Sequence, residues 1–340
     1  LRAAEASGRR AVELIGSGLT PDRIITEPAV ENALRVLLAI GGSTNAIIHL
    51  TAVVGRLGIR VSLERMNQLS DTTPVLVNLK PTGDAYMEDF FAAGGMSAVL
   101  RELEPLLHLD CLTITGETLG ERIDSGRQAY VDRRVIAPLA APVEPVGGLV
   151  ALFGSLAPRG AILKRSAADR NLFEREGRAV VFSSLEDLSA RIDDPALDVS
   201  ADDFLVLQNA GPKSPSGMPE AGYLPIPSKL ARAGIKDMVR ISDARMSGTA
   251  FGTIVLHISP DAASAGPLGL VRNGDRIRLS VENRSIDLLV DDAELQARRA
   301  EMAQKTQPDY SPARGYQKLY YDTVLQADEG CDFDFLQGKQ

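Results

Sequence analysis

A proline- and glycine-rich stretch divides this sequence into two parts of different character. Residues 137–148 read Ala-Pro-Leu-Ala-Ala-Pro-Val-Glu-Pro-Val-Gly-Gly and show no helical periodicity. Proline removes a backbone donor and glycine loosens the backbone, so neither a long helix nor a central strand is expected to cross such a stretch. We therefore predict one domain at residues 1–145 and a second at residues 146–340.

The first part carries the pattern of amphipathic helices. Thr26 is placed to cap a helix, Pro28 stands in its first turn, and apolar residues recur at helical spacing until Gly41-Gly42. A second apolar helix follows at once, which predicts a buried helix pair. Further helices are expected at 62–69, 85–93, 96–103 and 117–123, and strands at 74–79 and 111–114. The alternation predicts part of a layered α/β domain.

The second part is a series of short strands separated by turns. Strands are expected at 149–153, 161–164, 179–182, 204–207, 238–241 and 253–258, followed by a hairpin of 276–281 with 285–290. Only a few helices accompany them, such as 185–192 and 292–302. Many short strands with few helices predict a β-barrel or a sandwich.

The composition narrows the classes of function. The chain has 45 acidic and 37 basic residues and a formal charge of -8, which disfavours nucleic acid as a partner and favours a small molecule. Its 2 cysteines exclude a disulfide framework and form no Cys-x-x-Cys zinc motif, which fits the reducing cytoplasm. No apolar run reaches the roughly 20 residues of a membrane helix, so we expect no membrane partner.

Two loops are placed to carry chemistry, because each follows a predicted strand. Residues 208–220 form a Gly/Pro/Ser-rich loop that ends in the carboxylate of Glu220, and residues 243–252 form a glycine-punctuated loop that presents Ser247 and Thr249. Both are also consistent with simple turns. Ser247 lacks the Gly-x-Ser-x-Gly context of many hydrolases. A serine can instead act as a base where a nearby cation stabilises its alkoxide, and Glu220 is the natural metal-ligand candidate.

Three motifs in this order resemble the signatures of the dihydroxy-acid and sugar-acid dehydratase family. They are Gly41-Gly-Ser-Thr-Asn45, Ser216-Gly-Met-Pro-Glu220 and Arg245-Met-Ser-Gly-Thr-Ala-Phe-Gly252. The Arg-Met-Ser-Gly-Thr form and the closing segment Glu329 to Leu336 look closer to the pentonate and hexonate dehydratases, which act on aldonates such as arabinonate or xylonate. The resemblance implies a cluster-bearing α/β domain followed by a β-barrel similar to the swivelling domain of aconitase.

The resemblance also implies a reaction and roles for particular residues. The reaction is dehydration of an aldonate to a 2-keto-3-deoxy acid, with an iron–sulfur cluster, of the 2Fe-2S type, as Lewis acid on the departing C3 hydroxyl and Mg2+ at the carboxylate end. Ser247 matches the serine that removes the C2 proton, Glu220 a Mg2+ ligand, and Thr249 a threonine near the substrate hydroxyls. Ser43, Thr44 and Asn45 are further substrate-binding candidates, since a helix N-terminus can bind a carboxylate.

The sequence departs from the family pattern in its cysteines. The family's three cluster ligands lie upstream of the Gly-Gly-Ser-Thr-Asn motif, whereas Cys111 and Cys331 both lie downstream of it. We therefore expect no iron–sulfur ligand in this chain, expect the chain to be the C-terminal part of a longer enzyme, and expect it to be inactive alone. The resemblance suggests a homodimer or homotetramer. Two alternatives stay open: a non-catalytic binding or scaffold remnant, and a serine hydrolase.

Overall fold

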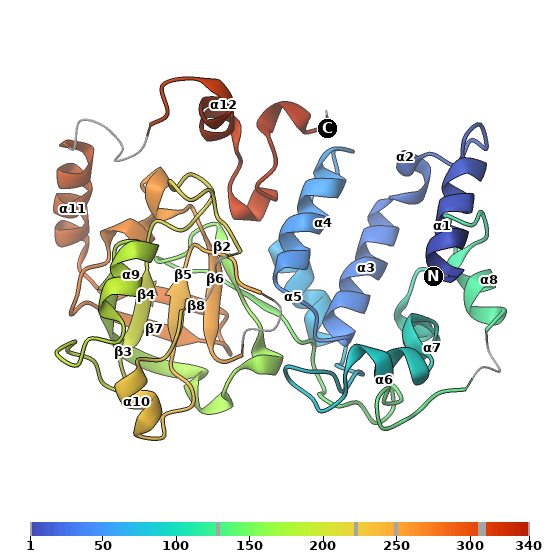
Figure 1. Cartoon of the computed structure of the whole chain (residues 1–340), viewed down its shortest axis with the longest axis horizontal. Coiled ribbons are helices and arrows are strands. Elements are labelled where there is room, and N and C mark those ends of the chain that lie inside the picture. The colour runs from blue at the N-terminus through green and yellow to red at the C-terminus, as the bar shows by residue number, and fades with distance from the viewer. Residues whose placement is uncertain (1, 127–129, 221–223, 248–250, 305–310, 339–340) are drawn as a thin grey trace.

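The computed structural model describes residues 2–126, 130–220, 224–247, 251–304 and 311–338. The early part of the chain forms a bundle of helices, and the later part forms a curved sheet that a C-terminal segment partly covers (Figure 1). The prediction of an α/β protein with a barrel-like domain is confirmed. Within the described ranges, no helix is long and apolar enough to cross a membrane.

Local signals in the sequence start several helices of the first part. Thr26 caps α3 by accepting the amide of Ala29 at 3.4 Å, and Ser62 caps α5 by accepting that of Arg65 at 3.1 Å. Thr118 opens α8 in a reciprocal capping box with a glutamate three residues on. The helices are α1 (Arg2–Glu13), α2 (Pro21–Ile24), α3 (Glu27–Ala39), α4 (Asn45–Gly55), α5 (Leu63–Asp71), α6 (Met87–Ala92), α7 (Gly95–Leu103) and α8 (Leu119–Asp124), with a 3-10 turn η1 (Glu104–Leu106).

The strands expected at 74–79 and 111–114 are present only as isolated bridges. Val75 pairs with Glu144, Val77 with Ile136, and Leu112 with Thr118. The side chains of Val75 and Val77 are nonetheless buried, as the apolar pattern indicates. The apolar pattern therefore predicts burial correctly. A β-ladder also needs a continuous neighbouring strand, and a single stretch of sequence does not reveal whether one is present.

The second part is an eight-stranded sheet in the order β1-β2-β6-β5-β4-β3-β7-β8. Strands β3 to β6 pair in parallel at the centre, and antiparallel pairs flank them on both sides. The strands are β1 (Val150–Leu152), β2 (Gly160–Leu163), β3 (Glu174–Phe182), β4 (Phe204–Leu207), β5 (Arg240–Ser242), β6 (Ile254–Ser259), β7 (Arg276–Ser280) and β8 (Ser285–Leu288).

The two edges of this sheet meet next to Phe153 and nearly close a barrel. The amide of Phe153 donates to the carbonyl of Arg284 at 2.9 Å, and the amide of Ile286 donates to the carbonyl of Phe153 at 2.7 Å. Closure satisfies edge groups that would otherwise be open to pairing with another chain. The interior is apolar and includes Val206 and Val255, both fully buried.

The remaining helices lie around the barrel (Figure 1). Side chains of α9 and α10 pack with the outward faces of β3, β4 and β6 in a second apolar cluster. The helices are α9 (Leu185–Arg191), α10 (Ser228–Arg232), α11 (Asp292–Gln304) and α12 (Gly315–Thr323). The 3-10 turns are η2 (Arg165–Ala167), η3 (Arg170–Leu172), η4 (Ala262–Ser264), η5 (Pro267–Leu270), η6 (Ala327–Glu329) and η7 (Asp334–Leu336).

The helical part and the barrel share a core along β1 and β2. Leu149, Ala151 and Ile162 belong to the same apolar cluster as residues of α3 and α5. The buried side chain of Asn67 on α5 also exchanges two hydrogen bonds with the backbone of Ala151, at 2.8 and 2.9 Å. Because this core crosses the predicted boundary at residues 145 and 146, the division into two domains stays a prediction.

The C-terminal segment returns from the barrel to α4. The guanidinium of Arg56, just after α4, holds Asp332 through two hydrogen bonds of 2.8 and 2.9 Å. The amide of Gly338 donates to the carbonyl of Gly55 at 2.9 Å. The C-terminal segment is thereby held against the last turn of α4.

Candidate active site

Two of the three sequence motifs follow neighbouring parallel strands. Strand β4 ends at Leu207 and leads into the loop that contains Glu220, while β5 ends at Ser242 and leads directly to Arg245 and Ser247. The carboxyl ends of adjacent parallel strands lie at the same edge of a sheet, and ligand sites of open α/β sheets form there. The third motif reaches the same place from the helical part, through the first turn of α4.

Asn45 connects the three motifs directly. Its side-chain amide nitrogen donates to Oε1 of Glu220 at 3.0 Å and to the carbonyl of Met246 at 2.9 Å. Asn45 itself is buried, with 8% of its surface exposed, while its Oδ1 atom is buried and has no hydrogen-bond partner among the described residues. In the structure its donor group holds Glu220 against the segment that leads to Ser247, and its role in substrate binding stays a prediction.

Glu220 and Arg245 form the charged part of the site. The Glu220 side chain is 44% exposed, and its Oε2 lies 4.0 Å from a terminal nitrogen of Arg245. Arg245 is more buried, at 27%, and its Nε donates to the carbonyl of Met218 at 3.0 Å. A separation of 4.0 Å is too long for a hydrogen bond. The carboxylate is therefore accessible, fixed on one oxygen by Asn45 and attracted by a cation at the other.

Ser247 lies at the rim of this cluster. It is exposed and follows Met246, whose side chain is buried and whose carbonyl accepts from Asn45. Thr249, the other candidate of this motif, lies outside the described residues. Ser43 and Thr44 are used locally: the Ser43 hydroxyl accepts the amide of Asn45 at 3.2 Å, and Thr44 is buried with 5% of its surface exposed. Their predicted role in substrate binding stays a prediction.

A buried carboxylate beneath the loops has no counterpart among the residues predicted from the sequence. Asp243, fully buried, accepts the amide of Ala210 at 3.0 Å and that of Ala262 at 2.9 Å. It thereby ties the loop after β4 and the turn after β6 to the end of β5. Burial, reinforced by the charge of Asp261, raises the pKa of Asp243 to about 7. Its position directly after a buried strand is the only signal of it in the sequence.

The charge of Arg245 reaches three groups of the C-terminal segment and of β6, namely Cys331, Tyr320 and His257. Burial raises the pKa of the Cys331 thiol to about 12 and that of the Tyr320 hydroxyl to about 12. Cys331 packs against Met218, with 3.4 Å between the two sulfur atoms. His257 lies in the same region, since Arg245 contributes to lowering its pKa. The sequence gives no reason to expect a reactive thiol at Cys331 and assigns no role to His257.

Comparison with known proteins identifies the family. The model for the N-terminal region of dihydroxy-acid/6-phosphogluconate dehydratases matches residues 1–122, and the model for the C-terminal region matches residues 134–331. The chain belongs to the dihydroxy-acid/6-phosphogluconate dehydratase family. The resemblance expected from the three motifs is thus confirmed.

Several curated members of the family are similar over nearly all of this chain. An L-arabonate dehydratase of Azospirillum brasilense is 48% identical over 98% of the chain and 58% of its own length. A 6-deoxy-6-sulfo-D-gluconate dehydratase of Pseudomonas putida is 45% identical over 99% of the chain and 58% of its own length. A dihydroxy-acid dehydratase of Ignicoccus hospitalis is 40% identical over 98% and 59%. The chain thus spans somewhat more than half the length of these relatives.

The two cofactors that the family resemblance implies differ in how well they fit the described residues. A cluster requires several thiolates at one place, but the chain's only cysteines are Cys111 beside Thr26 in the helical part and Cys331 beside Met218. Burial raises the pKa of both thiols. These cysteines therefore do not fit a cluster.

Glu220 does fit Mg2+ as a single ligand, because it offers an accessible carboxylate oxygen, the ligand type that Mg2+ prefers. The described ranges contain no group of three or more His, Cys, Asp and Glu side chains that could hold a metal ion. The fit of this member of the family to Mg2+ thus rests on Glu220 alone.

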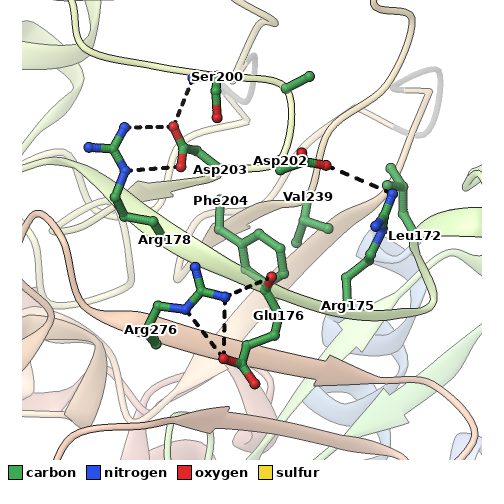
Figure 2. Close-up of a pocket in the computed structure, with 11 residues that line it drawn as sticks. Leu172, Arg175, Glu176, Arg178, Ser200, Asp202, Asp203, Phe204, Val239 and Arg276 are labelled. Atoms are coloured by element: carbon green, nitrogen blue, oxygen red, sulfur yellow. Dashed lines mark hydrogen bonds and ion pairs between the residues drawn. The ribbon is translucent and has the colours of Figure 1, made fainter.

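A separate pocket of about 500 Å³ lies at the other end of the barrel (Figure 2). It is built around the first residues of β3, β4 and β7, whereas the family motifs follow the last residues of β4 and β5. Its charged side chains pair with one another: Arg178 binds Asp203 at 2.8 Å and Arg276 binds Glu176 at 3.2 Å (Figure 2). We assign no function to this pocket.

Proposed function

We propose that this protein takes part in the dehydration of a sugar acid, an aldonate, to a 2-keto-3-deoxy acid. Water leaves as the C2 proton and the C3 hydroxyl, and the resulting enol tautomerises to the ketone. The observation that carries the proposal is the pair of hydrogen bonds from Asn45, which hold Glu220 beside the segment of Ser247. Relatives named arabonate and sulfogluconate dehydratases support the substrate class.

The proposed roles follow from the chemistry of the step. Removing a proton next to a carboxylate builds negative charge on the carboxylate oxygens, so a cation at that place stabilises the transition state. Mg2+ bound at Glu220 would supply this charge. Ser247 is proposed as the base that takes the C2 proton, because it is exposed at the same rim. Thr249 and the Ser43–Asn45 turn are proposed to contact the substrate hydroxyls and carboxylate.

The residues of this chain account for the proton-abstraction half of the reaction. In this proposal Asn45 orients the Glu220 carboxylate, Arg245 contributes positive charge near it, and Ser247, as an alkoxide stabilised by nearby cationic charge, would accept the C2 proton at its Oγ. No step is assigned through an iron–sulfur cluster, because neither Cys111 nor Cys331 fits as its ligand. A homodimer or homotetramer in the cytoplasm is the proposed setting, in keeping with the family resemblance.

The test is product formation from a panel of aldonates. The gene product that contains this chain is purified, its intact mass is recorded, and 2-keto-3-deoxy acid is measured with Mg2+ present. We expect Ser247→Ala to lower turnover by at least about 100-fold, with its unfolding free energy within about 0.5 kcal/mol of the wild type because the residue is exposed. Ser125→Ala, at an exposed serine of the helical part, is the control. Unchanged turnover in Ser247→Ala would exclude this serine as the base.

A further inference from the structure

Arg240, the first residue of β5, is buried together with its charge. The residue is 4% exposed, and its Nη2 donates to Oδ1 of Asp237 at 2.9 Å. Asp237 in turn accepts the amide and the hydroxyl of Thr253 at 2.8 and 2.7 Å. The guanidinium is therefore fixed at the end of the barrel where the parallel strands β5 and β6 begin. A buried ion pair is weak evidence for added stability, so the other contacts of this arginine indicate what it does.

The same guanidinium holds the far ends of the two segments that carry Glu220 and Ser247. Its Nη1 donates to the carbonyl of Leu224 at 3.1 Å, and its Nη2 donates to the carbonyl of Phe251 at 2.9 Å. Leu224 and Phe251 lie four positions after Glu220 and Ser247, respectively. Two nitrogens of one planar group thus set the distance between two carbonyls that belong to different loops.

Gly252 leaves the space for this contact. A Cβ atom at residue 252 would lie 1.9 Å from Nη2 of Arg240 and 2.4 Å from Oδ1 of Asp237, closer than non-bonded atoms can approach. The glycine has a φ of +114°, and its amide donates to the carbonyl of Ala167 at 2.9 Å. The peptide unit between Phe251 and Gly252 is therefore held on both sides, by Arg240 at its carbonyl and by Ala167 at its amide.

Arg240 is the last of three connections between the two segments among the described residues. Near their starts, Asp243 accepts the amide of Ala210 at 3.0 Å. In the middle, the side chain of Asn45 joins them through the two hydrogen bonds described above. The connection by Arg240 lies beyond Glu220 in one segment and beyond Ser247 in the other. Each of these two side chains is thus bracketed by connections that precede and follow it.

We propose that Arg240 is a positioning residue that fixes Glu220 and Ser247 relative to each other through the carbonyls of Leu224 and Phe251. The reaction that this arrangement serves rests on the proposed function, whereas the holding of the two segments does not. The two claims can therefore be tested separately, one by hydrogen exchange without substrate and the other by turnover.

The first test is Arg240→Lys in the gene product that contains this chain. Lysine retains the charge beside Asp237, but one ammonium nitrogen cannot replace two guanidinium nitrogens. We expect hydrogen exchange, measured by mass spectrometry without metal or substrate, to become at least about 10-fold faster in the peptides that contain Leu224 and Phe251. Arg298→Lys is the matched control, because Arg298 is also buried and bonds carboxylates and a carbonyl, all within residues 270–294. It should leave both peptides unchanged.

The second test is steady-state turnover of an aldonate by the same variants. Asn45 still holds Glu220 in Arg240→Lys, so we expect KM to stay within about 3-fold while kcat per folded molecule falls by at least about 10-fold. A residue that acts only through stability changes the fraction of folded enzyme and leaves kcat per folded molecule unchanged. That is the result expected for Arg298→Lys.

Gly252→Ala tests the same contact from the other side. Its Cβ atom has to push Arg240 away from the carbonyl of Phe251, so we expect faster exchange in the Phe251 peptide and a similar loss of kcat. Gly274→Ala is the matched control, because Gly274 has a φ of +93° but nothing within 4 Å of an added Cβ atom. It shares the backbone strain without the collision.

Three results would overturn the positioning role. They are wild-type exchange in either peptide of Arg240→Lys, wild-type kcat per folded molecule in Arg240→Lys, and equal effects of Gly252→Ala and Gly274→Ala. If the wild type itself forms no product from any aldonate, the proposed function fails. Hydrogen exchange then still decides whether Arg240 holds the two segments together.

Discussion

The side-chain amide of Asn45 lies 3.0 Å from Oε1 of Glu220, although 175 positions separate the two residues in the chain. The same amide reaches the carbonyl of Met246, 201 positions away, at 2.9 Å. An Asn side chain offers two N–H donors in a fixed plane, so these bonds set the position of Glu220 relative to the Ser247 segment. These two bonds bring the three motifs, which lie far apart in the sequence, together in one place.

Replacing Asn45 is expected to affect activity more than its effect on stability explains. Asn45→Ala removes both hydrogen bonds and leaves the Met246 carbonyl without its donor, which costs about 1–3 kcal/mol of unfolding free energy. Aldonate turnover per folded molecule should fall by at least about 10-fold, since misplacement of reacting groups lowers the rate of the chemical step. Urea unfolding and the product assay measure the two effects.

Asn67→Ala is the matched control for this variant. Asn67 is likewise buried and makes two hydrogen bonds, to the backbone of Ala151, but it lies between α5 and β1 and contacts none of the motifs. We expect a similar loss of stability with turnover per folded molecule unchanged. Equal losses of turnover in both variants would show that Asn45 acts only through the stability of the fold.

Metal dependence should be lost at Glu220. Glu220→Gln preserves size and the acceptor for Asn45 but removes the charge that a divalent cation requires. We expect the Mg2+ concentration for half-maximal turnover to rise by at least about 10-fold, the equivalent of about 1.4 kcal/mol in cation binding. Chelator treatment followed by Mg2+ titration measures it, with the exposed Glu282→Gln as control. An unchanged Mg2+ requirement in Glu220→Gln would rule out this ligand.

The sequence predicted the elements of this fold better than the contacts of its site. The strand 204–207 is found at β4 with the predicted bounds, because four consecutive buried apolar residues between turn signals leave little alternative. The motifs predicted Ser247 and Glu220 as candidates. The link through Asn45, the buried Asp243 and the β-bulge of β6 at His257 depend on long-range contacts, and the only local signal among them is the position of Asp243 directly after a buried strand.

The attachment of α11 to the barrel should depend on Arg298. Its side chain is 9% exposed, and it bonds Asp275 at 2.5 and 3.0 Å, Glu294 at 2.7 Å and the carbonyl of Leu270 at 2.9 Å. Arg298→Ala leaves the 10% exposed Asp275 side chain without its cation, so we expect a loss of about 3–5 kcal/mol in urea unfolding.

The neighbouring Arg299→Ala is the control for that loss, because Arg299 is exposed on the same helix. It should change the unfolding free energy by less than about 0.5 kcal/mol. A loss below about 1 kcal/mol in Arg298→Ala would mean that this ion-pair network behaves like an ordinary surface pair.

The buried neutral ring of His257 should make the protein sensitive to acid. Its pKa is about 3 in the folded state against the ordinary histidine value of 6.5 in the unfolded chain, so below pH 6.5 the unfolded chain binds a proton that the folded chain does not. Stability from this group is therefore present above pH 6.5 and decreases as the pH falls toward 3, by up to about 1.4 kcal/mol per pH unit.

His257→Asn isolates this contribution, because asparagine tolerates the left-handed backbone of this residue, with its φ of +60°, and does not titrate. Urea unfolding of both proteins is measured between about pH 7 and pH 4. In the difference between their unfolding free energies, the contribution of the carboxylates that both proteins share cancels. We expect the wild type to lose stability relative to His257→Asn as the pH falls, even if the variant is less stable at neutral pH. Parallel curves would mean that the ring is protonated in the folded state as readily as in the unfolded chain, so that burial does not lower its pKa.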